Sequence, residues 1–204
     1  MSLRTTLMAA AAVVGMSAAA FAVPISGQLS LNGYVSAIGS TSVSGATGLN
    51  FQGADGVTDN GSAPGTITNF GAGSGTFAGI TCNGGSCGTI KDIASFATSA
   101  PIASFLTLNS NGISFDVSSL AVTSRDMTAG SITLVANGLI HETGFDNTAG
   151  QFILTAQGNN ITSFSATTLA TAVPEPMSLA LLGGALATVG LIRRKKAYTA
   201  SLDF

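Results

Sequence analysis

The chain has 204 residues, of which 8% are charged and 46% are hydrophobic. It is long enough for one domain and more apolar than soluble proteins usually are. Between its two apolar ends, residues 23–172 hold two basic and seven acidic side chains. Because no basic patch is available to neutralise phosphates, we expect no nucleic-acid partner.

The first 22 residues have the features of a secretory signal peptide. A single cation, Arg4, precedes an apolar stretch over residues 7–20, and Ala20-Phe21-Ala22 has the small-x-small pattern of a cleavage site. We therefore predict export by the secretion machinery and cleavage by signal peptidase between Ala22 and Val23. The alternative is a retained N-terminal anchor.

The first half of the body, residues 23–172, alternates short apolar segments with Gly, Ser and Thr. Residues 25–34 predict a strand that ends in an Asn32-Gly33 turn, and Leu49 and Phe51 mark a second strand. Glycine recurs through residues 59–79, which favours short strands and loops, with Phe77 as a core contact. Only residues 92–98 have the spacing of a helical turn.

The second half predicts a β-hairpin over residues 105–108 and 113–117, joined by Asn109-Ser110-Asn111-Gly112. Four further strands are expected at residues 132–135, 138–141, 151–156 and 161–166. A spacing of roughly ten residues between turn signals is typical of a β-sandwich or jelly roll. Alternation places seven side chains in its core: Phe105, Leu108, Phe115, Val117, Leu134, Phe152 and Leu154.

The two cysteines, Cys82 and Cys87, are separated by Asn83-Gly84-Gly85-Ser86. In a chain that leaves the reducing cytoplasm, this spacing favours a small-loop disulfide. A metal site would need further ligands, which the one histidine, His141, cannot supply. We therefore expect no metal centre and no cofactor.

Catalytic patterns are weak. His141 lies in a predicted strand beside Glu142, and no Gly-x-Ser-x-Gly turn is present, so we interpret His141 as a structural or exposed residue. The chain lacks tryptophan, the usual platform for sugar stacking, and its carboxylates have no aromatic neighbours, which disfavours a glycosidase. Asp55 and Asp59 lie in a Gly-rich loop without the full calcium-loop pattern; a plain turn is favoured, and Ca²⁺ is the ion to test. No catalytic residue is assigned, and we do not expect an enzyme.

The C-terminal end combines three features. Val173-Pro174-Glu175-Pro176 keeps the backbone extended, because proline fixes φ and disfavours helix in the residue before it. Residues 177–192 are uncharged and would form a helix roughly 24 Å long, close to the thickness of a bilayer core. Arg193-Arg194-Lys195-Lys196 follow, as the positive-inside rule requires of the cytoplasmic side, and residues 197–204 form a short cytoplasmic tail. The alternative is a buried core helix.

The stretch from Val173 to Lys196 closely resembles the PEP-CTERM sorting signal of exported proteins in exopolysaccharide-producing Gram-negative bacteria. In that family the signal is recognised by exosortase, a membrane protease-transpeptidase that is thought to cut near the motif. The resemblance implies a protein that is anchored in the inner membrane before processing and is then placed at the cell surface or in the extracellular matrix.

Two functions remain compatible with these observations. The first is a structural or adhesive surface protein, whose partners are exosortase, the secretion machinery and, transiently, the inner membrane. The second is a small polysaccharide-binding module of the matrix, with exopolysaccharide as its partner. The absence of tryptophan favours the first.

Overall fold

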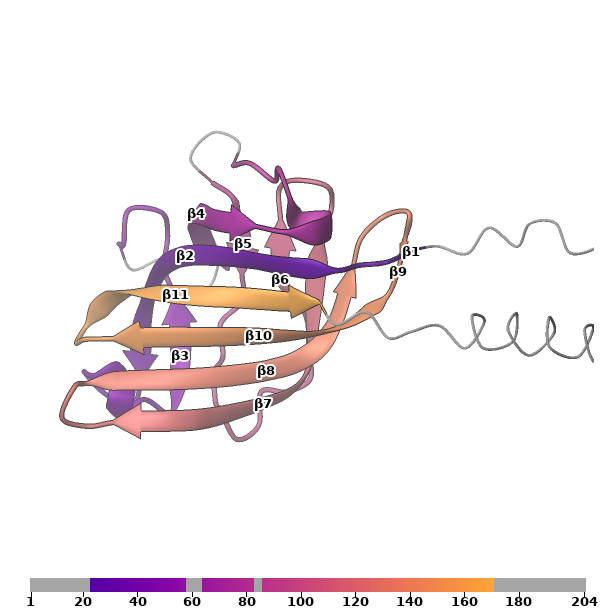
Figure 1. Cartoon of the computed structure of the whole chain (residues 1–204). Coiled ribbons are helices and arrows are strands. Elements are labelled where there is room, and N and C mark those ends of the chain that lie inside the picture. The colour runs from indigo at the N-terminus through magenta and orange to yellow at the C-terminus, as the bar shows by residue number, and fades with distance from the viewer. Residues whose placement is uncertain (1–22, 58–63, 83–85, 171–204) are drawn as a thin grey trace, which may run out of the picture.

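The computed structural model describes residues 23–57, 64–82 and 86–170, and these residues form an all-β domain (Figure 1). The strands are β1 (Val23–Pro24), β2 (Gly27–Ile38), β3 (Gly48–Phe51), β4 (Gly65–Gly73), β5 (Gly88–Ile90), β6 (Ile102–Leu108), β7 (Ser114–Asp126), β8 (Ser131–His141), β9 (Phe145–Asp146), β10 (Thr148–Gln157) and β11 (Ile161–Ala170). Two 3₁₀ turns, η1 (Val43–Gly45) and η2 (Gly75–Phe77), complete the described elements.

The main sheet closes on itself. Its order is β11-β10-β8-β7-β6-β5-β4-β2-β3, and β11 also pairs with β2 in antiparallel register from Ile161↔Ser36 to Ala170↔Gly27. This pairing joins eight strands into a barrel, while β3 pairs only with the end of β2. The prediction of an all-β body is confirmed. The more detailed prediction of a β-sandwich or jelly roll, with two separate sheets, was wrong. The pairing of β2 with β11 closes the sheet and uses the strand edges that a sandwich would leave open.

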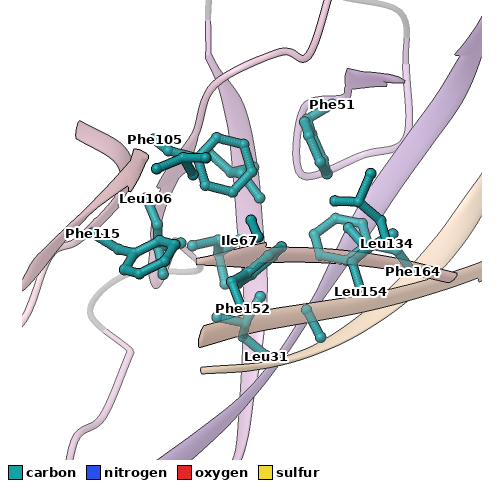
Figure 2. Packing of buried hydrophobic residues seen from close by; sticks show 14 of the residues in the cluster. Leu31, Phe51, Ile67, Phe105, Leu106, Phe115, Leu134, Phe152, Leu154 and Phe164 are labelled. Atoms are coloured by element: carbon teal, nitrogen blue, oxygen red, sulfur yellow. The ribbon is translucent and has the colours of Figure 1, made fainter. Parts of the chain in front are cut away.

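The interior of the barrel is filled by aromatic and aliphatic side chains (Figure 2). All seven side chains predicted for the core are buried, each at most 3% exposed. Phe105 contacts Phe51 and Phe152 edge-to-face, at centroid distances of 6.0 and 5.3 Å. Phe164 contacts Phe51 in the same way at 5.2 Å, so these rings connect β3, β6, β10 and β11 through the core.

Two Asn-Gly pairs that predicted turns lie inside continuous strands instead. Asn32-Gly33 is in the middle of β2, and Asn137-Gly138 is in β8, which joins the two strands expected at residues 132–135 and 138–141. A Cβ on Gly33 would lie 2.7 Å from the Phe164 ring, and one on Gly138 would lie 1.8 Å from the Asp116 carbonyl oxygen. Both glycines are therefore needed for close packing between strands, not for a turn.

The other local predictions have mixed outcomes. The turn between β6 and β7 is confirmed, with Asn111 and Gly112 both at positive φ. Phe77 is buried as expected. Residues 92–98 form no helix: Ile93 makes a β-bridge with Leu49, and one hydrogen-bonded turn follows at residues 95–99.

The described domain begins and finishes at the same end of the barrel. Ala170 pairs with Gly27, and Val23 pairs with Phe145 beside them (Figure 1). At the opposite end, η1 is held by Arg125, whose guanidinium donates to the carbonyl oxygens of Ser44 and Ala46 at 2.6 and 2.8 Å.

Candidate functional site: a polar groove on the outer face

A groove with a volume of about 670 Å³ crosses the outer face of β10, β11, β2 and β4. In β2, β10 and β11 the residues between the buried ones project outward. β4 pairs with β2 across a register shift between Asn32 and Gly33 and contributes the consecutive residues Thr68 and Asn69. The polar residues that line the groove are Asn32, Tyr34, Thr68, Asn69, Thr155, Gln157, Ser163 and Ser165. Gly33, Ala156 and Phe164 complete the described lining, and none of the described lining residues is charged.

Strand register sets these side chains in rows. Thr155 pairs with Ser165, Ser165 with Asn32, and Asn32 with Asn69. Directly paired residues share one face of a sheet, and neighbouring strands lie about 4.8 Å apart. The row across four strands is therefore about 14 Å long, and the Ser163–Tyr34 pair lies beside it.

Most of these side chains have no partner within the described part of the protein. Thr68 Oγ1 donates to the Asn32 carbonyl oxygen at 3.1 Å, and Gln157 Nε2 donates to the Ala129 carbonyl oxygen at 2.9 Å. The side chains of Asn32, Asn69 and Tyr34 make no hydrogen bond to any described residue. Their donors and acceptors are therefore available to a ligand or to water.

Two aromatic residues are in the described lining of the groove, and of these Tyr34 is exposed whereas Phe164 is buried. Tyr34 is 37% exposed, and its backbone carbonyl oxygen accepts from the Gln52 N–H at 2.9 Å. Gly56, at φ +69°, lies so close that a Cβ there would be 3.5 Å from the ring. The loop at Gly56 therefore borders the ring, and part of the residue faces solvent.

A second polar patch on the same outer surface is organised differently. Gln151 Nε2 donates to Asn137 Oδ1 at 3.0 Å, and Asn137 Nδ2 donates to Ser119 Oγ at 3.5 Å. These side chains on β10, β8 and β7 bond one another across the strands. These side chains therefore bond to one another, in contrast to Asn32 and Asn69 of the groove.

His141 is held at the end of β8 by two side chains. Its Nε2 lies 3.1 Å from Asp116 Oδ2, and its Nδ1 lies 2.8 Å from Asn147 Oδ1. Asp116 Oδ1 also accepts from the Ser104 N–H at 2.6 Å, at a residue with φ +47°. Sequence reasoning did not find these partners, because they lie on different strands. The cluster ties β6, β7 and β8 to the turn before β10.

Glu142, next to His141, is placed differently. Its Oε2 is shielded from solvent and has no hydrogen-bond partner among the described residues. This burial raises the pKa of the Glu142 carboxyl, because a charged oxygen without a partner is poorly solvated. Glu142 Oε2 therefore forms no hydrogen bond with the His141 cluster.

The predicted Cys82–Cys87 disulfide is confirmed, with a Cα–Cα distance of 4.3 Å. Cys87 is buried, and its N–H donates to the Ile67 carbonyl oxygen at 2.9 Å, so the bridge lies directly before β5. Asn83, Gly84 and Gly85 lie outside the described residues.

The possible Ca²⁺ site that the sequence suggested is in the loop after β3, at Asp55 and Asp59. Asp55 Oδ1 accepts from the Val57 N–H at 2.9 Å, which is a local turn contact, and Asp59 lies outside the described residues. Within residues 23–57, 64–82 and 86–170, no group of three His, Cys, Asp or Glu side chains is arranged to hold a metal ion.

The predicted sorting and export residues lie largely outside the described residues. These are Ala22, the motif Val173, Pro174, Glu175 and Pro176, the helix expected at residues 177–192, and the cluster Arg193, Arg194, Lys195 and Lys196. Val23, the predicted first residue of the mature chain, begins β1. In the described ranges, no helix has the length and apolar character needed to cross a membrane.

Comparisons with known proteins add no family to these observations. No family model, no curated protein and no solved structure matches the chain.

Proposed function

We propose that the protein is an exported, PEP-CTERM-sorted component of the cell surface or extracellular matrix, with a structural or adhesive role and with processing by exosortase. The observation that carries this proposal is the order of Val173-Pro174-Glu175-Pro176, the uncharged residues 177–192 and the basic cluster Arg193–Lys196. The motif comes first, then a segment close to the length needed to span a membrane, and then the positive charges that set the topology. Sorting of an exported protein needs these three elements in this order.

One feature of the domain supports an extracytoplasmic location. The Cys82–Cys87 disulfide suits an oxidising compartment, because thiols are kept reduced in the cytoplasm.

The test is to replace Arg193, Arg194, Lys195 and Lys196 by glutamine and to fractionate the cells. The expected result is loss of correct topology and accumulation of unprocessed protein, because the positive charges orient the anchor. The matched control exchanges arginine for lysine and lysine for arginine at the same four positions, which keeps the charge and should preserve processing.

A second arm removes the sorting protease from the host. Unprocessed protein should then stay in the inner-membrane fraction. Normal processing and location, both in the glutamine variant and without the protease, would contradict the proposal.

A further inference from the structure

We propose that the groove over β10, β11, β2 and β4 binds a neutral polysaccharide. This proposal names a surface and a partner for the adhesive role. Its biological setting, the cell surface or extracellular matrix, rests on the proposed function. The groove is the place in the described domain where unpaired amides, hydroxyls and an exposed aromatic ring meet on one face.

The chemistry of the lining selects an uncharged ligand with many hydroxyl groups. A phosphate or carboxylate ligand calls for Arg, Lys or a helix N-terminus, and no described residue in the lining of the groove is charged. Asn32 and Asn69 each offer a carbonyl oxygen and two N–H donors. Sugar hydroxyls both donate and accept hydrogen bonds, so these amides can accept from them through the carbonyl oxygen and donate to them through the N–H groups.

The shape of the site favours a chain over a single sugar. The row from Thr155 through Ser165 and Asn32 to Asn69 is about 14 Å long and crosses four strands. It lies on the outer surface of the barrel and is open to solvent. A small molecule would leave much of this row uncovered, whereas an extended polymer would follow it.

Tyr34 supplies the apolar contact that such a ligand needs. Tyrosine combines an apolar ring with a polar tip, and it contributes contact area at low cost in side-chain entropy. The loop at Gly56 borders this ring on one side. At this position the Tyr34 ring therefore provides the stacking surface that tryptophan usually provides in sugar-binding sites.

The competing interpretation is an ordinary solvated face of a sheet, since outward residues of antiparallel strands are commonly polar. The Ser119–Asn137–Gln151 patch is such a face, and its side chains bond one another. In the groove, Asn32 and Asn69 face each other in register, and their side chains form no hydrogen bond with each other or with other described residues. This difference between two patches of the same barrel is what points to a ligand.

The experiment uses the full chain purified in a mild detergent. Binding is measured by affinity electrophoresis and titration calorimetry against a panel of soluble neutral polysaccharides (α-glucan, β-glucan, mannan and galactan) and one acidic polyuronate. Retardation by at least one neutral polymer, and none by the polyuronate, is the expected result. No binding to any neutral polymer, or binding to the polyuronate alone, would overturn the proposal.

Three variants locate the site. Tyr34→Ala and the double change Asn32→Ala with Asn69→Ala should each weaken binding about tenfold or more, because each removes contacts of the order of one good hydrogen bond or stacking interaction. Tyr34→Phe keeps the ring and should bind within about threefold of the parent.

The control is Gln28→Ala, an exposed amide on the same strand β2 but outside the groove. It should leave binding unchanged, and circular dichroism checks the fold of every variant. Equal binding by all variants would show that the groove is not the site. Because binding is measured on purified protein, its failure is distinct from a failure of sorting, which only the fractionation reports.

Discussion

At the scale of single residues, the phenylalanines of the barrel decide how its walls meet. Phe105 contacts Phe51 on one side and Phe152 on the other, and Phe152 also contacts Phe115 at 6.4 Å. Edge-to-face pairs contribute about 0.5–1.5 kcal/mol each beyond the burial of their area. Phe115 is therefore part of a chain of rings, and its loss should be felt across the core.

Phe115→Ala should lower the free energy of unfolding by about 3–5 kcal/mol, a large share of the roughly 5–15 kcal/mol of an ordinary domain. The side chain is 1% exposed, so its removal leaves a cavity that the surrounding strands cannot fill. The neighbouring change Ser114→Ala, on the outer face, should cost little. Thermal melts followed by circular dichroism compare the two, and equal melting temperatures would contradict the assignment of Phe115 to the core.

At the scale of elements, β8 shows how a strand can contain a strong turn signal and remain a strand. Gly138 lies opposite Val117 beside a bulge at Ser118, where the Ser118 hydroxyl donates to the Asn137 carbonyl oxygen at 3.0 Å. The Asp116 carbonyl oxygen occupies the position that a Cβ on residue 138 would take. Close approach of β7 to β8 therefore depends on glycine at this position.

Gly138→Ala should destabilise the domain by about 1–3 kcal/mol, because the added methyl group forces the backbones of β7 and β8 apart. The matched change Asn137→Ala alters the adjacent, exposed residue and introduces no such contact, so its effect should be smaller. Urea unfolding of both variants measures the difference. A larger loss for Asn137→Ala would mean that Gly138 acts through something other than close packing.

At the scale of the whole molecule, closure of the barrel depends on β11. This strand pairs with β10 on one side and with β2 on the other, and it contributes the buried Phe164 and Ala166 to the core. Both edges of the sheet that would otherwise be free are used in these pairings. The barrel therefore becomes complete only when the last described strand meets the first long one.

The body over residues 23–170, without either terminal segment, should fold alone with a β-type circular dichroism spectrum and one cooperative melt. A shorter body over residues 23–160 lacks β11, so the edges of β2 and β10 and the ring of Phe51 lose their cover. We expect it to lose cooperative unfolding and to aggregate. A helical spectrum for the longer body, or an equally sharp melt for the shorter one, would contradict this view of closure.

The groove could not be predicted from the sequence, unlike the strands and the core residues. Its residues come from positions 32–34, 68–69, 155–157 and 163–165, and none of them carries a motif. An outward Asn or Ser is the ordinary residue of a strand exposed to water, so alternation alone does not separate a binding surface from a solvated one. The distinction between Asn32, which lacks a partner, and Asn137, which has one, depends on the register of neighbouring strands.

The sequence by itself determined the local features of this protein: an all-β body, the turn at residues 109–112, the seven core side chains and the cysteine pair. Alternation and turn chemistry act between residues close in the chain, which is why they can be read there. Only the tertiary structure decided that the sheet closes through β2 and β11, that Gly33 and Gly138 serve packing, and that His141 meets Asp116. Each of these depends on contacts between distant residues, and such contacts are set by strand order and register, which a local pattern does not contain.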